Sequence, residues 1–207
     1  MFLVGIEQKV KKMYKMLFKR VFDLIVSVFL MIPLIFIFLI ISILIKLDSK
    51  GNILFKQERL GKNGKIFKIY KFRTMVKNAE SIGTGIYTSD DDPRITRIGN
   101  YLRKTSLDEL PQIINIIKGD MSFVGPRPPV PYHPYRIDEY SADKIRRFDV
   151  RPGITGMAQA YGRNTLTWDE RIVYDVKYAD NISFMMDMKI IYKTFISVVR
   201  KENIYRE

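Results

Sequence analysis

The chain contains one apolar run long enough to match a lipid bilayer. The run LIVSVFLMIPLIFIFLIISILI, from Leu24 to Ile45, holds 22 residues and no charged side chain. As a straight helix it would extend about 33 Å, close to the hydrocarbon thickness of a bilayer. The run is too long for a cleavable signal, and no small-x-small cleavage site follows it. We therefore predict a helix in contact with membrane lipid.

The charges around this run and a proline inside it bear on whether the helix crosses the bilayer. Basic residues precede the run at Lys11, Lys12, Lys15, Lys19 and Arg20, and follow it at Lys46, Lys50 and Lys56. Because cytoplasmic flanks carry an excess of Lys and Arg, both ends have cytoplasmic character. Pro33 removes the hydrogen bond to the Phe29 carbonyl, which predicts a kink. Two interpretations remain open: a helix that enters one leaflet, bends and returns, or a single span with a proline kink.

The first twenty residues have the periodicity of a basic amphipathic helix. The apolar residues Leu3, Ile6, Val10, Met13, Leu17 and Val21 recur at spacings of three and four, and Lys9, Lys11, Lys12, Lys15 and Lys19 fill other positions. Such a helix lies in the lipid interface with its apolar face buried. The alternative is a helix whose apolar face packs against the protein's own core.

The charge balance of the chain points to anionic partners. With 35 basic and 22 acidic residues, the formal net charge is +13. Such a surface attracts nucleic acid, anionic lipid or phosphorylated small molecules. A nucleic-acid-binding protein would explain the charge but has no need of a lipid-length apolar run. The chain has no cysteine and a single histidine, His133. Disulfides and thiolate chemistry are therefore excluded, and a His-rich zinc site is disfavoured.

The segment ILFKQERLGKNGKIFKIYKFRTM predicts a β-hairpin. Two alternating runs flank a turn at Gly61 to Gly64. In the second strand, one face carries Phe67, Ile69, Lys71 and Arg73. Cations that follow buried positions on one face would point at an anion. The alternative is an edge strand whose lysines extend to solvent.

Two adjacent carboxylates, Asp108 and Glu109, stand before a proline and an apolar helical stripe. The stripe consists of Leu110, Ile113, Ile114 and Ile117, and Gly119 ends it. With Ser106 as the N-cap, Pro111 would delete a hydrogen bond inside the helix; with Asp108 as the N-cap, Pro111 lies harmlessly in the first turn. We therefore expect Asp108 to cap the helix, and both carboxylates to stay ionised with depressed pKa values at its positive end. The alternative is a solvated acid pair on a helix surface.

The last third of the chain holds a turn-rich segment and two predicted helices. The segment DVRPGITGMAQAYGRN contains three glycines, which permit close backbone approach to a ligand. Thr167 and Glu170 form a capping box before a helix. The following helix, SFMMDMKIIYKTFISVVRK, is amphipathic, and it packs either on the core or on lipid. Its apolar side carries Phe184, Met188, Ile191, Phe195 and Val199. Asp187 lies in its first turn, where a solvated acid is the simplest explanation.

Together these segments resemble the bacterial sugar transferase family, the monotopic polyprenyl-phosphate phosphoglycosyl transferases. The matching stretches are KRVFD before the apolar run, GKIFKIYKFRTM, DPRITRIGNYLRKTSLDELPQIINIIKGDMSFVGPRP and RPGITGMAQAYGR. The resemblance covers nearly the whole chain, and its long central motif is highly specific. The length matches the small members, which consist of a catalytic domain and little else.

The resemblance implies transfer of sugar 1-phosphate from a UDP-sugar to undecaprenyl phosphate, with release of UMP. Members form a covalent intermediate on the aspartate of an Asp-Glu pair and use Mg²⁺. Asp108 matches that aspartate, and Glu109 matches its partner as metal ligand or proton-transfer group. Arg127 matches the phosphate-binding arginine of Pro-Arg-Pro. Four further residues fall on positions that resemble active-site residues of the family: Lys71, Arg103, Arg163 and Asp187.

The resemblance also implies the architecture and the location. We expect an α+β fold, mainly α, in a monotopic membrane protein with a re-entrant N-terminal helix, a small β-hairpin and interfacial amphipathic helices. Residues 1–50 would form the amphipathic and re-entrant membrane part, and residues 51–207 a cytoplasmic catalytic domain on the inner (plasma) membrane. One departure concerns the helix break, where small members often have Ser-Pro and this chain has Ile32-Pro33.

The expected partners are a UDP-sugar, undecaprenyl phosphate and membrane lipid, with no nucleic acid. The sequence assigns neither the sugar nor the oligomeric state. A membrane-anchored interaction module without catalysis remains the competing interpretation. It would explain the anchor and the charge, but not the Asp-Glu pair combined with Pro-Arg-Pro.

Overall fold

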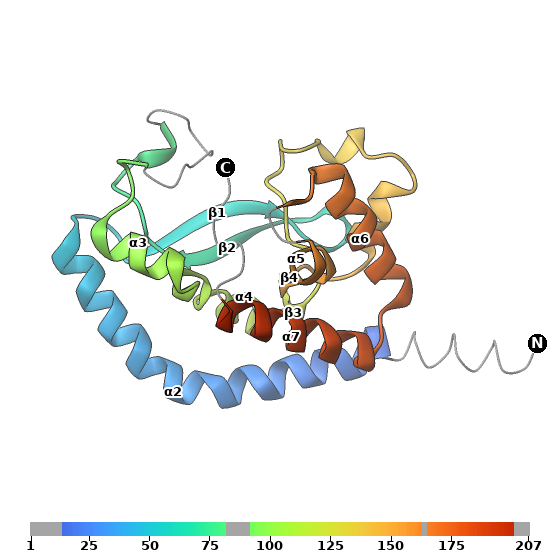
Figure 1. Cartoon of the computed structure of the whole chain (residues 1–207), viewed down its shortest axis with the longest axis horizontal. Helices are drawn as coiled ribbons and strands as arrows, with labels where there is room; N and C mark the ends of the chain where they lie inside the picture. Colours follow the sequence, from blue (N-terminus) through green and yellow to red (C-terminus); the bar gives the residue numbers. More distant parts are fainter. Residues whose placement is uncertain (1–13, 82–91, 163–164, 201–207) are drawn as a thin grey trace, which may run out of the picture.

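The computed structural model describes residues 14–81, 92–162 and 165–200 (Figure 1). The amphipathic pattern predicted near the N-terminus lies largely outside these residues. The α-helices are α2 (Lys19–Asp48), α3 (Arg97–Lys104), α4 (Gln112–Lys118), α5 (Met157–Tyr161), α6 (Trp168–Asn181) and α7 (Phe184–Val199). The strands are β1 (Leu54–Leu60), β2 (Ile66–Phe72), β3 (Ser122–Val124) and β4 (Gly153–Thr155). A π-helical turn, η1 (Tyr14–Phe18), and several 3₁₀ turns complete the elements of the described residues. The mainly helical α+β class with small sheets is confirmed.

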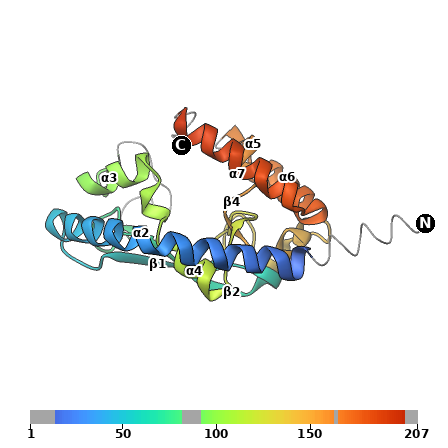
Figure 2. The ribbon, with the colours of Figure 1, turned by 90° about the horizontal axis from the view of Figure 1, so that it is seen from below.

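The predicted apolar helix is present as α2, a single helix of 30 residues. It stays helical through Pro33 and runs along one edge of the molecule, with a marked bend near its middle that agrees with the predicted kink (Figures 1 and 2). Its buried residues in the N-terminal half are polar: Lys19, Asp23 and Ser27. Its exposed residues are apolar except for Lys46, and they include Phe29 and Phe36 at 74% and 69% exposure. This distribution is the reverse of a helix in a soluble protein and suits lipid surroundings.

Both ends of α2 are bonded to the rest of the fold. At the N-terminal end, the Lys19 ammonium lies 2.6 Å from the Asp187 carboxylate on α7. At the C-terminal end, the Arg73 guanidinium donates to the Ser49 carbonyl at 2.6 Å. The Asp48 carboxylate also accepts from the N–H of Ile98 in α3 at 3.0 Å. The helix is therefore fixed to the rest of the fold at both of its ends.

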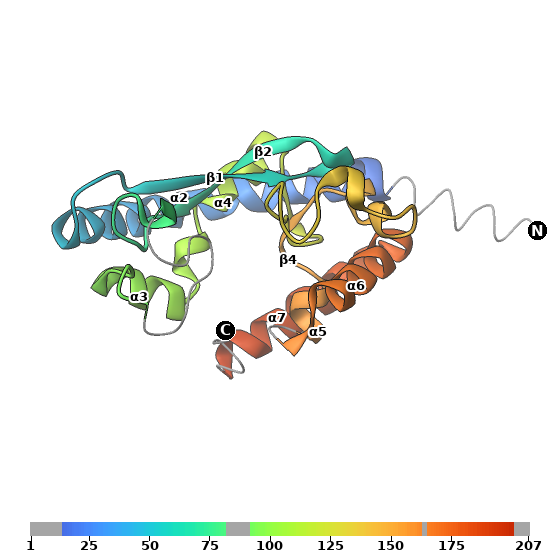
Figure 3. The same ribbon diagram turned by 90° about the horizontal axis from the view of Figure 1, so that it is seen from above.

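The predicted hairpin is confirmed as β1 and β2, which pair antiparallel from Leu54↔Phe72 to Leu60↔Ile66. Figure 3 shows the hairpin lying along α2, with α5, α6 and α7 in a second layer. Helix α4 is fixed to β2 by Asn115, which is fully buried. The Asn115 amide accepts from Tyr70 N–H at 3.0 Å and donates to the Lys68 carbonyl at 2.8 Å. This pairing sets β2 beside the turn that precedes α4.

Three glycines bring two distant segments into backbone contact. β3 and β4 form a two-stranded parallel sheet in the register Ser122↔Gly153 and Val124↔Thr155. A Cβ on Gly153 would lie 2.1 Å from the Gly125 nitrogen, and one on Gly156 would lie 2.2 Å from the Gly125 oxygen. The glycine-rich segment was predicted to approach a ligand closely. In the structure, two of its glycines approach this neighbouring backbone, and the close approach to a ligand stays a prediction.

Helices α6 and α7 follow the sequence signals closely. Thr167 and Glu170 form the predicted capping box at the start of α6. On α7, Ile190 faces the core at 1% exposure, whereas Phe184 and Phe195 are 50% and 63% exposed. The predicted apolar stripe of this helix therefore faces largely outward. Asp187 is 2% exposed, so it is not the solvated acid that its position suggested.

Candidate active site

Asp108 and Glu109 lie in a 3₁₀ turn, η4 (Leu107–Glu109), between α3 and α4. The turn is held by the hydrogen bonds Glu109 N–H to Ser106 O and Leu110 N–H to Leu107 O. The prediction that Asp108 caps the following helix is wrong: α4 begins at Gln112, and Pro111 occupies its N-cap position. Pro111 has no N–H to donate. A short 3₁₀ turn before it therefore loses fewer backbone hydrogen bonds than a continuous helix through Pro111 would. Gly119 ends α4 in the left-handed conformation, as predicted.

Two cations from distant parts of the chain meet at Glu109. The Lys71 ammonium, on β2, lies 2.7 Å from Glu109 Oε1 and 3.7 Å from Asp108 Oδ2. The Arg127 guanidinium, from the segment after β3, lies 2.9 Å from the same Oε1. The side chains of Asp108 and Glu109 are 13% and 18% exposed, and that of Arg127 is 40% exposed. The cluster is thus largely desolvated and opens to solvent on the Arg127 side.

The environment shifts the two carboxyl pKa values in opposite directions. Burial raises the pKa of Asp108, and the charge of Glu109 adds to the increase, although Lys71 offsets part of it. Burial alone would also raise the pKa of Glu109, but Arg127 and Lys71 outweigh it and hold the pKa well below its usual range. The prediction that both pKa values are depressed is therefore correct for Glu109 and wrong for Asp108. The cause is the unequal sharing of cations, which the adjacency of the two acids does not reveal.

Arg103 of α3 lies near this cluster. Its Nε donates to Thr74 Oγ1 at 2.9 Å. Burial lowers the pKa of Arg103, and attraction to Asp108 opposes that shift. The structure therefore brings together Asp108, Glu109, Lys71 and Arg127, with Arg103 close by. Arg163 lies outside the described residues.

Asp187 is not part of this cluster. Its carboxylate accepts hydrogen bonds from Tyr14 and Tyr178 at 2.7 Å each and pairs with Lys19 at 2.6 Å. These partners come from η1, α6 and α2, so the acid joins three elements of the fold. Sequence analysis missed this network. The available signal was Lys19 and Asp23, two charged residues four apart at the start of an apolar helix.

The carboxylate pair fits a magnesium ion better than a metal that needs a full protein cage. Among the described residues, no three or more His, Cys, Asp or Glu side chains gather as a metal-ligand group. Mg²⁺ is usually bound through one or two carboxylates, with waters and substrate phosphates completing its shell. Both ion pairs of Glu109 use Oε1. Binding of a cation through Oε2 would therefore displace neither Lys71 nor Arg127.

Comparison with known proteins places this chain in a family. The sequence pattern described as "Bacterial sugar transferase" matches residues 14–201. The chain belongs to the bacterial sugar transferase family. The match includes all the predicted site residues, and it confirms the family resemblance.

Individual relatives agree with this assignment. The chain is 42% identical over 190 residues to "Uncharacterized sugar transferase EpsL" of Bacillus subtilis (strain 168), with 91% of each chain covered. It is 39% identical over 200 residues to "Undecaprenyl-phosphate glucose phosphotransferase" of Komagataeibacter xylinus, covering 93% of this chain and 38% of that protein. It is 36% identical over 218 residues to "Undecaprenyl-phosphate galactose phosphotransferase" of Salmonella typhimurium, covering 98% of this chain and 45% of that protein. The longer relatives therefore contain a region similar to this sugar transferase plus further sequence.

Proposed function

We propose that this protein transfers sugar 1-phosphate from a UDP-sugar to undecaprenyl phosphate, releases UMP, and thereby initiates a bacterial surface glycan or glycoconjugate. The observation that carries the proposal is the arrangement around Asp108 and Glu109. One acid is paired tightly with two cations, while its neighbour has a raised pKa beside the same lysine. The names of the two phosphotransferase relatives support the lipid phosphate as acceptor.

In the first half-reaction, a carboxylate oxygen of Asp108 attacks the phosphorus that carries the sugar. The bond from this phosphorus to the bridging oxygen of the diphosphate breaks. UMP leaves with that oxygen and the bonding electron pair, and Asp108 carries the sugar phosphate as an acyl phosphate. Because a carboxylate and a phosphate repel each other, the approach is opposed by about 4 kcal/mol for two unit charges 4 Å apart at an effective dielectric near 20.

Charges already at the site reduce this repulsion. Lys71 and Arg127 can contact the phosphoryl oxygens while they remain beside Glu109, and fixed cations stabilise the transferring phosphoryl group in the transition state. A magnesium ion held by Glu109, with Asp108 adjacent, would supply further neutralisation of the diphosphate. Glu109 stays ionised over the working pH range because its pKa is depressed.

In the second half-reaction, an oxygen of undecaprenyl phosphate attacks the same phosphorus. The bond between Asp108 and phosphorus breaks, and the carboxylate is regenerated. The sugar is then linked to the lipid through a diphosphate. No net proton transfer is required in either step, so the residues of the site act by nucleophilic attack, orientation and charge stabilisation.

We also propose that α2 enters one leaflet and does not cross the bilayer, so that the catalytic region lies on the cytoplasmic face of the plasma membrane. The support is that both ends of α2 bond to the same body of protein, through Lys19 and Arg73. Helix α7, with its exposed Phe184 and Phe195, would lie in the lipid interface. Cysteines introduced at Gln8 and Lys50 should react only from the cytoplasmic side. The chain has no native cysteine to confuse the labelling, and reaction of either one from the opposite side would establish a span.

The decisive experiment separates the two half-reactions. A panel of UDP-sugars is incubated with enzyme and Mg²⁺ in the absence of lipid, and UMP and protein mass are measured. The correct donor should release up to one UMP per enzyme and leave sugar phosphate on the protein, which undecaprenyl phosphate then removes. Asp108→Asn should form no adduct. If UMP appears only when lipid is present, or Asp108→Asn transfers normally, the covalent mechanism is wrong. If no donor releases UMP with or without lipid, the non-catalytic alternative stands.

A further inference from the structure

Arg127 lies in a segment of four residues whose consecutive carbonyl oxygens are all hydrogen-bonded. The donors are Gly153 N–H to Pro126 O at 3.0 Å, Arg147 to Arg127 O at 3.0 Å, Arg59 to Pro128 O at 3.0 Å, and Leu60 N–H to Pro129 O at 2.9 Å. These donors come from β4, from the 3₁₀ turn η6 (Lys144–Asp149) and from β1. The segment is therefore held from three directions.

The composition of this segment explains why its carbonyl groups matter. Pro126, Pro128 and Pro129 have no N–H and have fixed φ angles. Pro128 also restricts Arg127 to extended backbone conformations. Such a segment has almost no backbone donors with which to bond its surroundings. Its position is therefore set mainly by the groups that donate to its carbonyls, and Arg147 is the one that bonds the carbonyl of Arg127 itself.

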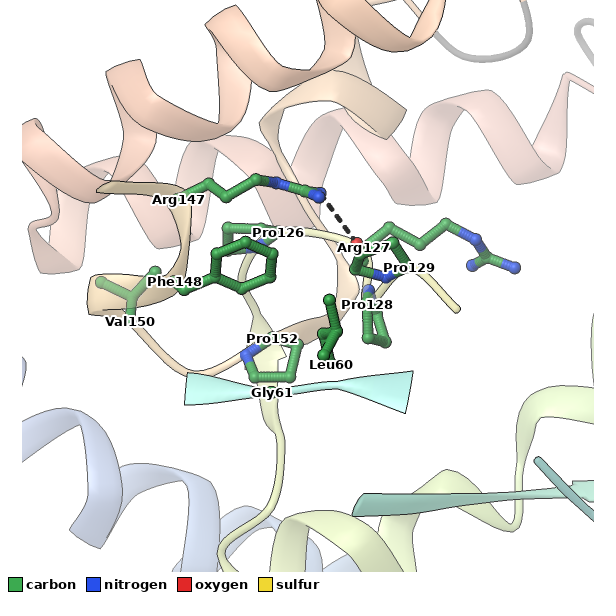
Figure 4. Close-up of a pocket in the computed structure, with 10 residues that line it drawn as sticks. All are labelled: Leu60, Gly61, Pro126, Arg127, Pro128, Pro129, Arg147, Phe148, Val150 and Pro152. Atoms are coloured by element: carbon green, nitrogen blue, oxygen red, sulfur yellow. Dashed lines mark hydrogen bonds between the residues drawn. The ribbon is translucent and has the colours of Figure 1, made fainter. Parts of the chain in front are cut away.

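Arg147 is held rigidly by buried partners. It is 2% exposed, and its Nε and Nη2 donate to Asp175 Oδ2 of α6 at 3.1 and 2.6 Å. Its Nη1 donates to the Tyr140 hydroxyl at 3.3 Å. Figure 4 shows Arg147 bonded to the Arg127 carbonyl across a small pocket, with the Arg127 side chain pointing away from it. The planar guanidinium thus connects α6, Tyr140 and the backbone of Arg127.

We propose that Arg147, oriented by Asp175 and Tyr140, is a positioning residue that sets the place of the Arg127 guanidinium beside Glu109 and so the rate of phosphosugar transfer. This inference rests on the proposed function. Arg147 itself contacts neither Glu109 nor, on this assignment, the substrate.

A gain in folding stability is a weak explanation for the buried Arg147–Asp175 ion pair. A buried ion pair costs desolvation of two charges, and apolar replacements of similar volume are often neutral or stabilising. Geometry is a better reason, because an arginine fork fixes several acceptors in one plane. A small displacement of a catalytic group, of about 1 Å, can cost on the order of 10²-fold in rate.

The test uses Arg147→Lys, which keeps the charge but loses the planar fork. The steady-state rate and the initial UMP burst are measured against pH. The rate constant for UMP release should fall about 10- to 100-fold while the melting temperature and the burst amplitude stay near wild type. The acidic limb of the rate profile should also move to higher pH, because the charge of Arg127 lowers the pKa of both Asp108 and Glu109. The other charged groups facing this pair are Lys71 on β2 and Arg103 on α3.

A second variant separates positioning from folding. Arg147→Met combined with Asp175→Leu removes the pair without leaving an unpaired buried charge, and it should show the same loss of rate in a folded protein. The matched control is the exposed pair Arg146–Asp180, which joins the same two elements. Arg146→Gln and Asp180→Asn should leave the rate and the pH profile unchanged. If the Arg147 variants lose only stability, with the rate per active site and the acidic limb unmoved, the proposal is wrong.

The proposal can also be tested without turnover. The guanidinium resonances of Arg127, assigned with Arg127→Lys, are compared in wild type and in Arg147→Lys at one pH. Displacement of Arg127 from Glu109 should change the chemical shifts of these resonances. Unchanged resonances overturn the positioning role even if no UDP-sugar is ever turned over. Displaced Arg127 resonances, in a protein whose wild type releases no UMP, would keep the positioning role and reject the proposed function.

Discussion

Two acidic clusters in this molecule have similar components and different exposure. At Asp187, one carboxylate is 4% exposed and is bonded to one lysine and two tyrosines. At Asp108 and Glu109, two carboxylates are 13% and 18% exposed and share Lys71 and Arg127. The first cluster joins η1, α2, α6 and α7, whereas the second joins β2, η4 and the segment after β3.

The difference lies in how completely each charge is satisfied. At Asp187 both carboxylate oxygens have donors, and one of these donors is the buried ammonium of Lys19. At the Asp-Glu pair, both ion pairs of Glu109 converge on one oxygen, and Arg103 adds a third cation near two acids. A site with surplus positive charge and solvent access can accept an anionic substrate, whereas a satisfied and buried acid supports the fold.

The largest expected effect is a loss of stability at the buried cluster. Asp187→Leu leaves the Lys19 ammonium buried without its partner, and removal of one member of a buried pair costs about 3–5 kcal/mol. The free energy of unfolding, measured in detergent, should fall by that amount. The rate per folded molecule should stay near wild type. A raised KM for the UDP-sugar with unchanged stability would instead support the family-based prediction that Asp187 belongs to the substrate site.

The open cluster should respond in the opposite way. Lys71→Ala and Arg127→Ala should each lower the rate about 10²- to 10³-fold, or roughly 3–4 kcal/mol of transition-state stabilisation. The free energy of unfolding should change little, because each variant removes a partly exposed cation and leaves Glu109 paired with the remaining one. Lys68→Ala is the matched control for Lys71, since Lys68 lies on the same strand and is exposed. Wild-type turnover in both active-site variants would show that these cations are not catalytic.

The sequence predicted local features of the fold well. The hairpin, the end of α4 at Gly119 and the Thr167 capping box each depend on residues close together in the chain. The adjacency of Asp108 and Glu109 likewise needed no tertiary structure. Lys71 and Arg127 were assigned through family resemblance, and the structure brings them to this pair from 38 and 18 residues away.

The wrong predictions share a physical cause. In each case the burial or the pKa of a residue depends on partners that are distant in sequence. The opposite pKa shifts of Asp108 and Glu109 depend on which oxygen Lys71 and Arg127 reach. The buried state of Asp187 depends on Lys19, 168 residues away. The start of α4 at Gln112, rather than after Asp108, likewise accompanies contacts of α4 with β2 and α2 that the local sequence does not reveal.

The smallest expected effect is a shift along the pH axis, and its sign is specific. Asp108 attacks only when it is ionised, so activity is lost as pH falls through its pKa. Burial raises that pKa, and the negative charge of Glu109 raises it further. The acidic limb of the wild-type rate of UMP release should therefore lie above the usual pKa range of aspartate, with a decline of about tenfold per pH unit below it.

Glu109→Gln provides the test of this coupling. The variant removes the negative charge of Glu109 beside Asp108, and Lys71 then interacts with the Asp108 carboxylate alone. Both changes favour the ionised form, so the pKa of Asp108 should fall. The acidic limb should move to lower pH even though the overall rate drops through loss of the cation ligand. Asp187→Asn is the comparison, because its carboxylate belongs to the other cluster, and it should leave the limb in place. A limb that moves upward in Glu109→Gln, or that moves equally in Asp187→Asn, would show that Asp108 is not the group whose ionisation limits the reaction.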